Sequence, residues 1–298
     1  MGLLTIAGAC DSHSHVFGPF DRYPLAAKRS FNPPESPLEA LEGVWSSLGL
    51  EKSVLIQGSA HGEDHSAMLA AIASDREHRR GVALIASEIS DASLNALHQG
   101  GIRAIRFNWT RHLLGDDARS VQQRLDQASA LLSRIHRMGW HVELHVDATN
   151  LGLVENLLTP DGMLVVIDHM ARIDLRDVDA YAQLSRLISL LKHKHFWVKL
   201  SGADRMAANL TELDQCTSVL QQLLVAAPDR CVWGLDWPHV NLYRKRTDEE
   251  LVRLLMTAAQ DREALRRILC TNPDRLYGSA SEAPTLQTEP CLQGGGER

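Results

Sequence analysis

Two histidines near the start of the chain are spaced so that they can act together. His13 and His15 stand two apart in the stretch DSHSH, residues 11–15. Residues two apart on a β-strand project from the same face, so both imidazoles would enter one space. Neutral imidazoles there can bind a metal ion or hydrogen-bond to a substrate oxygen. The same spacing also occurs on surface and edge strands, so the pair alone leaves both interpretations open.

A carboxylate closes an apolar stretch near the other end of the chain. Asp236 lies in VWGLDWPHVNL, residues 232–242. Loss of hydration at such a position is expected to raise the pKa of the carboxylate towards that of a useful general base. An aspartate after a strand can instead cap a helix, but the sequence Trp237-Pro238 argues against an immediate helix start.

Two arginines are candidates for binding an anionic group. A guanidinium presents a planar fork that fits a carboxylate. Arg103 and Arg106 lie in opposite strand phase, and we expect Arg106 to face the site because it is nearer the end of its strand. The second candidate is Arg205, for which a salt bridge to the neighbouring Asp204 is an equally good interpretation.

Short apolar stretches alternate with longer helical patterns, which predicts an α/β fold. The eight expected strands are 8–15, 52–57, 80–86, 102–108, 140–146, 163–169, 195–201 and 230–236. The expected helices lie near 37–49, 64–78, 91–99, 117–138, 149–158, 178–193, 211–226 and 247–259. We expect one closed (β/α)8 TIM barrel over residues 8–278 and a disordered tail over 279–298. An open doubly wound sheet is the alternative, but the GxGxxG fingerprint of such sheets is absent after the first strand.

Polar residues concentrate where the expected strands end, and the strand middles are mostly aliphatic. In barrels of this kind, the C-terminal strand ends carry the chemistry. The residues at these ends are His13, His15, Ser59, His61, Arg106, Asn108, His145, Asp147, Asp168, His169, Ser201, Arg205 and Asp236. Within 140–146, His141, Glu143 and His145 share one phase, so the intervening aliphatic residues should face the helices.

Composition narrows the possible partners. The chain has 298 residues and a formal net charge of −6 with no long basic run, so nucleic acid is not an expected partner. No apolar stretch approaches the 18 or so residues of a membrane span. Five scattered cysteines without CxxC spacing are typical of reduced thiols, so we expect a cytoplasmic protein. A monomer or small homo-oligomer is expected.

Several stretches, in this order, resemble the amidohydrolase superfamily and within it the metal-independent lactonases. They are DSHSHVFGP (11–19), VLIQGSAHGEDHSAML (54–69), GIRAIRFNWTR (101–111), VVIDHMAR (165–172), WVKLSGADRM (197–206) and VWGLDWPHVNL (232–242). A single HxH motif is weak evidence, whereas HxH, DHMxR and GxDWPHxN in this order are specific. The resemblance covers residues 10 to about 277.

The resemblance implies a ring-opening hydrolase for a carboxylate-bearing lactone. Asp236 would be the general base, and His13, His15 and His169 would polarise the lactone carbonyl. The substrate-binding residues would be Arg106, Arg205, Ser59, His61, His145, His112 and Asn241. No cofactor is implied.

Two positions depart from the pattern of the branch. Members that act on a dicarboxylate have arginine where this chain has His112 and tyrosine where it has His145. An imidazole does not replace an always-charged bidentate donor, so the substrate can carry fewer carboxylates or be a sugar lactone. His145 also completes a second set, His13, His15, His145 and Asp236, which could hold one Zn²⁺ or another divalent metal.

Three other functions remain alternatives to an acidic-lactone hydrolase. They are a sugar-acid lactone hydrolase or isomerase, a metal-dependent decarboxylase or amide hydrolase, and a barrel retained only to bind a ligand. The presence of His13, His15, His169 and Asp236 together argues against the last.

Overall fold

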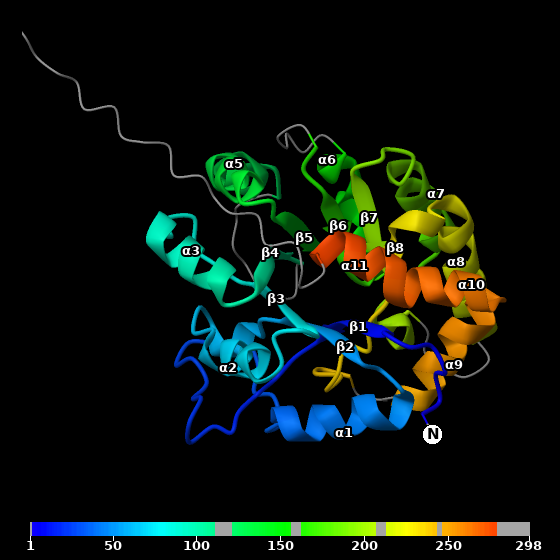
Figure 1. Ribbon diagram of the computed structural model, residues 1–298. Coiled ribbons are helices and arrows are strands. Elements are labelled where there is room, and N and C mark those ends of the chain that lie inside the picture. Colours follow the sequence, from blue (N-terminus) through cyan, green and yellow to red (C-terminus); the bar gives the residue numbers. More distant parts are fainter. Residues whose placement is uncertain (1, 111–120, 156–161, 207–212, 243–245, 279–298) are drawn as a thin grey trace, which may run out of the picture.

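Eight parallel strands form the centre of the molecule (Figure 1). The computed structural model describes residues 2–110, 121–155, 162–206, 213–242 and 246–278. The strands pair in sequence order and are β1 (Cys10–Ser14), β2 (Lys52–Ile56), β3 (Arg79–Ala83), β4 (Ile102–Trp109), β5 (His141–Val146), β6 (Val165–Ile167), β7 (Phe196–Lys199) and β8 (Cys231–Val232).

The last strand returns to the first and closes the barrel. The backbone N–H of Ser12 donates to the Trp233 carbonyl at 2.8 Å, and the N–H of Asp236 donates to the His13 carbonyl at 2.7 Å. Gly234 permits this approach, because a Cβ there would lie 2.4 Å from the His13 nitrogen. The expected TIM barrel is confirmed, and the alternative of an open doubly wound sheet is wrong.

Helices surround the strands, as Figure 1 shows. They are α1 (Leu38–Leu48), α2 (Ser66–Ser74), α3 (Asp91–Gln99), α5 (Val121–Arg137), α6 (Leu151–Val154), α7 (Ala180–Leu190), α8 (Leu213–Ala226), α9 (Asp248–Ala259), α10 (Arg262–Arg266) and α11 (Asn272–Tyr277). Helix α9 begins with a capping box in which Thr247 and Glu250 satisfy each other's backbone N–H groups. Among the described helices, none combines the length and the apolar character that crossing a membrane requires.

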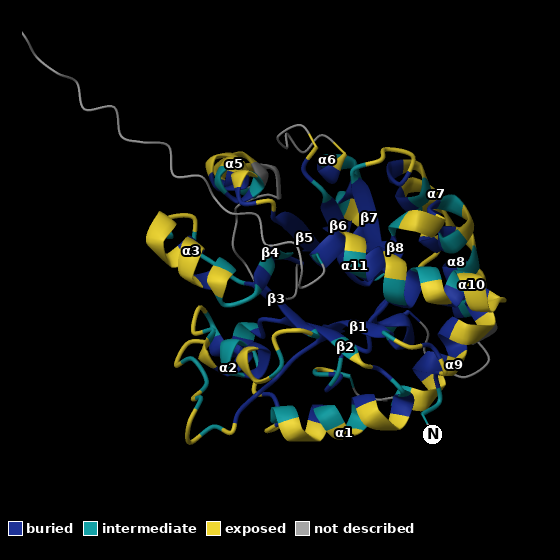
Figure 2. Cartoon of the chain, viewed as in Figure 1, coloured by how far each residue is buried: buried dark blue, intermediate teal, exposed yellow. Residues whose placement is uncertain are grey.

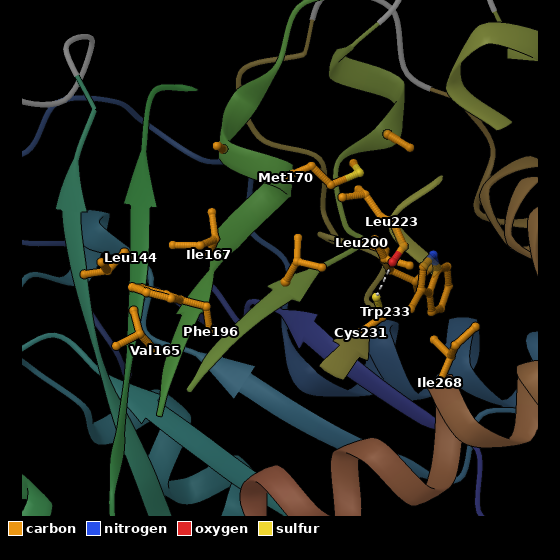
Figure 3. Close-up of a cluster of buried hydrophobic side chains, with 14 of the residues drawn as sticks. Leu144, Val165, Ile167, Met170, Phe196, Leu200, Leu223, Cys231, Trp233 and Ile268 are labelled. Carbon is orange, nitrogen blue, oxygen red and sulfur yellow. Dashed lines mark hydrogen bonds between the residues drawn. The ribbon is translucent and has the colours of Figure 1, made fainter. Parts of the chain in front are cut away.

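Two hydrophobic layers follow from the alternation of side chains along the strands. Leu144, Val165 and Ile167 point outwards and join a large core between the strands and helices, part of which Figure 3 shows with Leu223 of α8. Burying each such side chain contributes roughly 1.5–3 kcal/mol. Figure 2 shows the buried strands enclosed by helices whose outer surfaces are exposed.

A smaller core fills the barrel itself. Val54, Val166 and Trp197 point inwards and pack with Leu276 and Tyr277 of α11. The alternation predicted within β5 is confirmed, since its aliphatic residues join the outer core and its polar residues contact partners inside the barrel.

Several strands are shorter than expected at their C-terminal ends. The expected strand 163–169 stops at Ile167, and the expected strand 230–236 stops at Val232. The cause is local, because His169 and Asp236 both have positive φ, which is incompatible with an extended strand. The expected disordered tail, 279–298, lies outside the described residues.

Candidate active site

A cavity opens at the C-terminal ends of the strands, where the sequence placed the polar residues. It contains about 540 Å³ of empty space, part of which is open to solvent. The predicted site residues that line it are His15, Ser59, Arg106, His145, His169, Arg205, Asp236 and Asn241. His13 lies beneath them and is fully buried.

Asp236 follows β8 and lies beside the two histidines at the end of β1. Its Oδ1 lies 3.6 Å from Nε2 of His13 and 3.4 Å from Nε2 of His15. Its Oδ2 accepts two hydrogen bonds from Arg205, at 3.0 Å from Nε and 2.7 Å from Nη2. The two oxygens therefore differ: one is held by a guanidinium, and the other faces the two imidazoles.

The expectation of a raised pKa for Asp236 is wrong. Burial does raise the pKa of this carboxyl, but Arg205 and the neighbouring histidines outweigh burial and hold the pKa well below its usual range. Sequence reasoning paired Arg205 with Asp204 or with substrate, and did not foresee that it would bind Asp236. Asp236 is consequently a carboxylate throughout the neutral range.

His15 has a defined tautomer. Its Nδ1 lies 2.9 Å from the Ile56 carbonyl oxygen. Because a carbonyl oxygen can only accept, Nδ1 carries the proton. The other ring nitrogen, Nε2, faces Asp236 Oδ1 at 3.4 Å. Asp11 supports the whole arrangement, because its Oδ1 accepts from the backbone N–H groups of His13 and Leu235.

His13 occupies a fully buried position between two carboxylates. Its Nδ1 lies 3.7 Å from Asp168 Oδ1, and neither ring nitrogen has a hydrogen-bond partner in the described part of the chain. Burial, aided by the nearby Lys199, lowers the pKa of His13 well below its usual value, so the ring is neutral. A neutral ring with an uncommitted nitrogen next to Asp236 is suited to hydrogen-bond a substrate oxygen.

His169 begins a turn in which four consecutive residues, His169 to Arg172, have positive φ. Non-glycine residues rarely adopt this conformation. Nε2 of His169 accepts from Nη2 of Arg106 at 3.2 Å. Its Nδ1 therefore carries the proton and donates to Ser201 Oγ at 2.9 Å. Burial lowers the pKa of His169 to about 4.

The predicted orientation of the two β4 arginines is confirmed. Arg106 lines the cavity, whereas Arg103 donates to the His98 and Ile102 carbonyls away from it. Nε of Arg106 donates to Asp168 at 2.6 Å. Its Nη1 has no partner among the described residues and is available to a ligand.

Of three further predicted histidines, one lines the cavity, one lies behind it and one is outside the described residues. His145 lines the cavity, its Nδ1 lies 3.3 Å from Asn108 Oδ1, and burial lowers its pKa well below the usual value. His61 stands behind the cavity and stacks on Phe17, with ring centroids 5.8 Å apart. His112 lies outside the described residues.

Sequence reasoning missed Arg172 and two aromatic residues, Phe17 and Phe31, which also line the cavity. Arg172 donates from Nε to Asp147 at 3.2 Å, and its side chain is 32% exposed. The signal was present, because Arg172 is the arginine of the DHMxR motif. The aromatic residues had no comparable signal, since they lie in irregular segments without periodicity.

Donor atoms suited to a divalent metal converge at Asp236. Its Oδ1 lies 3.4 and 3.6 Å from the two Nε2 atoms. Ligands of a tetrahedral zinc ion are roughly 3.4 Å apart, but no donor cluster of the described chain brings His13, His15 and Asp236 all within 4.8 Å of one another. His145, the expected fourth ligand, joins neither three-residue donor cluster of the described chain; in one of these clusters His169 accompanies His13 and Asp236.

Comparisons with known proteins agree with this geometry. A family model described as Amidohydrolase matches residues 10–279, from β1 to beyond α11. The chain is 33% identical over 281 residues to the 2-pyrone-4,6-dicarboxylate hydrolase of Comamonas testosteroni, covering 91% of this chain and 90% of that protein. It is 30% identical over 279 residues to the 4-sulfomuconolactone hydrolase of Hydrogenophaga intermedia, covering 92% and 90%.

A solved structure from Pseudomonas putida is similar in fold. It is described as a candidate 2-pyrone-4,6-dicarboxylic acid hydrolase, and it superposes on this chain with a TM-score of 0.78 at 28% identity. The superposition covers 91% of this chain and 97% of the other.

Proposed function

The chain belongs to the amidohydrolase family, and we propose that it is a lactone hydrolase that opens the ring of an acid-bearing, 2-pyrone-4,6-dicarboxylate-like substrate. One observation carries the proposal. Three guanidinium groups, those of Arg106, Arg172 and Arg205, line a cavity in which Asp236 is the one carboxylate among the described residues. Arg106 and Arg172 each use Nε to bind an aspartate outside the cavity lining and keep terminal N–H groups for a ligand, which favours an anionic group beside the base.

The base in this proposal is Asp236 Oδ1. Arg205 fixes Oδ2, so Oδ1 is the oxygen available to take a proton from water. Nε2 of His15, 3.4 Å from Oδ1, contacts the same water and sets the direction of attack. A low pKa weakens Asp236 as a base, but a positioned carboxylate still accelerates proton transfer.

His13 stabilises the oxygen that becomes negative. His13 lies directly beneath the cavity, and we propose that its Nε2, which no group of the described chain binds, donates to the lactone carbonyl when the substrate is bound. Water adds to the carbonyl carbon, the ring C–O bond breaks, and the proton held by Asp236 passes to the departing ring oxygen. The product is a hydroxy acid or its keto tautomer, and Asp236 is again a carboxylate.

In this proposal, the arginines of the cavity bind the acid groups of the substrate. Arg106 offers Nη1, and the terminal nitrogens of Arg172 have no partner among the described residues. Charged hydrogen bonds of this kind contribute about 1.5–3 kcal/mol each. His145 is neutral and better suited to a hydroxyl or carbonyl group, so we propose fewer carboxylate contacts at that side of the cavity.

We propose that this reaction needs no metal. An ion held by His13, His169 and Asp236, the donor cluster of the described chain that includes the base, would lower the pKa of bound water and polarise the carbonyl. Two observations favour the metal-free route: Arg205 already neutralises Asp236, and Arg106 occupies the His169 nitrogen. Both cations would repel a divalent ion.

The test is an ultraviolet assay of 2-pyrone-4,6-dicarboxylate, 4-sulfomuconolactone and an uncharged 2-pyrone. Chelator-treated and zinc-supplemented enzyme are run side by side. We expect equal rates in both preparations and a kcat/KM roughly 100-fold lower for the uncharged ring, the equivalent of one or two lost charged hydrogen bonds. Loss of substrate only with zinc would overturn the metal-free route, and no loss of any acidic lactone would overturn the proposed function.

Two controls sharpen the assay. Arg106→Met should raise KM for the acidic lactones, whereas Arg103→Met, on the other face of the same strand, should not. Proton NMR of the product distinguishes a ring-opened acid from a new lactone, which would instead identify an isomerase.

A further inference from the structure

A second charged cluster lies inside the barrel, below the cavity. Lys199 of β7 and Glu143 of β5 are fully buried, and Lys199 Nζ lies 2.6 Å from Glu143 Oε2. The same Nζ lies 3.3 Å from Oδ1 of the fully buried Asp168. The hydroxyl of Tyr277, at the end of α11, donates to Glu143 Oε1 at 2.7 Å.

This cluster is connected to the site through Asp168. One of its oxygens, Oδ2, accepts from Arg106 at 2.6 Å, and the other, Oδ1, lies 3.7 Å from His13 Nδ1. Arg106 in turn donates to His169. A continuous path of polar contacts therefore runs from α11 along the barrel axis to three groups of the candidate site.

The charges within the path balance. Glu143 and Asp168 supply two negative charges, and Lys199 and Arg106 supply two positive charges. Without Lys199, two buried carboxylates would share one guanidinium, and Arg106 would be drawn from its position between Asp168 and His169. Only the cation at position 199 prevents that competition, because Tyr277 can donate a hydrogen bond but carries no positive charge.

Stability alone does not account for the cluster. A buried ion pair is often no more stabilising than apolar side chains of similar volume, since desolvation offsets the attraction. An apolar core that includes Val54, Val82 and Val166 also fills the barrel interior. Apolar residues at 143 and 199 would extend that core, so the charges point to a role in the site above.

We propose that Lys199 is a positioning residue, which neutralises Glu143 so that Asp168 is left to hold Arg106 in place beside His169 for the lactone. The proposal rests on the proposed function for its kinetic consequences. Lys199 does not touch the cavity and acts through Asp168. Tyr277 of α11 adds no charge and holds Glu143 by a hydrogen bond.

The test compares Lys199→Met with the double variant Lys199→Met/Glu143→Gln. The single variant leaves an excess negative charge, and we expect kcat/KM for the acidic lactone to fall about 10- to 100-fold, as is usual when an outer partner of a site residue is lost. The double variant restores charge balance between Asp168 and Arg106 and should recover most of this loss. Arg134→Met, which removes an exposed pair with Asp91, is the matched control and should match wild type.

A second readout does not depend on activity. Nitrogen-15 NMR of labelled histidines reports the tautomers of His13 and His169, assigned with His13→Gln and His169→Gln. The signals should change in Lys199→Met and return in the double variant. Folded Lys199→Met with unchanged signals, or a double variant no more active than the single, would overturn the proposal.

The two readouts also separate this proposal from the proposed function. If wild type opens no lactone but the histidine signals follow the charge balance, the positioning role stands and the lactonase assignment fails. If Lys199→Met does not fold, Glu143→Gln supplies the test instead, because it leaves an excess of positive charge in the cluster. Its surplus positive charge should draw Lys199 onto Asp168 and alter the same signals, and unchanged signals would overturn the proposal.

Discussion

Two buried clusters of charged residues lie one above the other in this barrel, and their distances differ. In the lower cluster, Lys199 is 2.6 Å from Glu143 and 3.3 Å from Asp168. In the upper cluster, Asp236 Oδ1 is 3.4 and 3.6 Å from two imidazole nitrogens, too far for good hydrogen bonds. The lower cluster is enclosed by protein, whereas the upper one borders the cavity, which has room for a substrate and a water molecule.

We therefore assign a positioning role to the lower cluster and the chemical step to the upper one. Buried polar groups are usually paired, so the uncommitted nitrogens of His13 are an exception that calls for a ligand. Of the four predictions that follow, three disturb the upper cluster and the last lies outside both clusters; they are given in order of decreasing effect.

The largest effect is expected for Asp236→Asn. The amide cannot accept the proton of the attacking water, and loss of a positioned general base typically costs about 10²–10⁴ in rate. Steady-state kcat with the acidic lactone measures the loss. Asp174→Asn, which alters an exposed pair with Arg176, is the control. A kcat within tenfold of wild type would remove Asp236 from the mechanism.

Gly234→Ala should disturb the upper cluster without changing any charge. The added Cβ would lie 2.4 Å from the His13 backbone nitrogen and 2.5 Å from its Cβ, so β1 and the segment after β8 must separate. We expect destabilisation of several kcal/mol, as is usual for overpacking against a rigid backbone, together with a reduced kcat. Thermal unfolding and kinetics are the measurements.

A matched glycine is available in α1. A Cβ at Gly43 would meet nothing within 4 Å. Gly43→Ala should therefore stabilise the helix by about 0.5–1 kcal/mol. If Gly234→Ala were as stable and as active as wild type, the close approach of the two strands would not matter for the site.

The pH dependence of stability should reveal the buried neutral His169. Its pKa is lowered to about 4 from an ordinary value of 6.5, so the unfolded chain binds the proton more readily than the folded one between these values. Folding is therefore weakened as pH falls from about 6.5 to 4, by up to about 3 kcal/mol from this group. Urea unfolding at several pH values measures the slope.

His169→Gln supplies the comparison for that slope. The variant should be less stable at neutral pH and should lose less stability on acidification. A slope identical to that of wild type would show that His169 is not held neutral.

The smallest effect is expected for Arg172→Met. This guanidinium lies at the mouth of the cavity and is paired with Asp147, outside both clusters. Loss of one charged contact to a substrate acid group should raise KM about tenfold and leave kcat nearly unchanged. Arg176→Met, in an exposed pair, is the control. An equal fall in kcat would instead place Arg172 next to the reacting atoms.

Much of the fold could be predicted from local patterns. Strand phase in β5 separated inward polar residues from outward aliphatic ones, and the same reasoning chose Arg106 over Arg103. The ends of the strands were harder to predict. Nothing in VVIDHMAR indicates that His169 to Arg172 turn with positive φ, because β-branched residues favour a strand up to that point and the turn depends on tertiary contacts.

The amino-acid sequence by itself determined the barrel, the face on which each strand residue lies, and the end at which the polar residues gather, since all three follow from periodicity and chain order. Only the tertiary structure decided that Arg205 binds Asp236 and that Asp236 therefore has a lowered pKa. The physical reason is distance: electrostatic interactions depend on a few ångströms between groups on strands that are far apart in the chain.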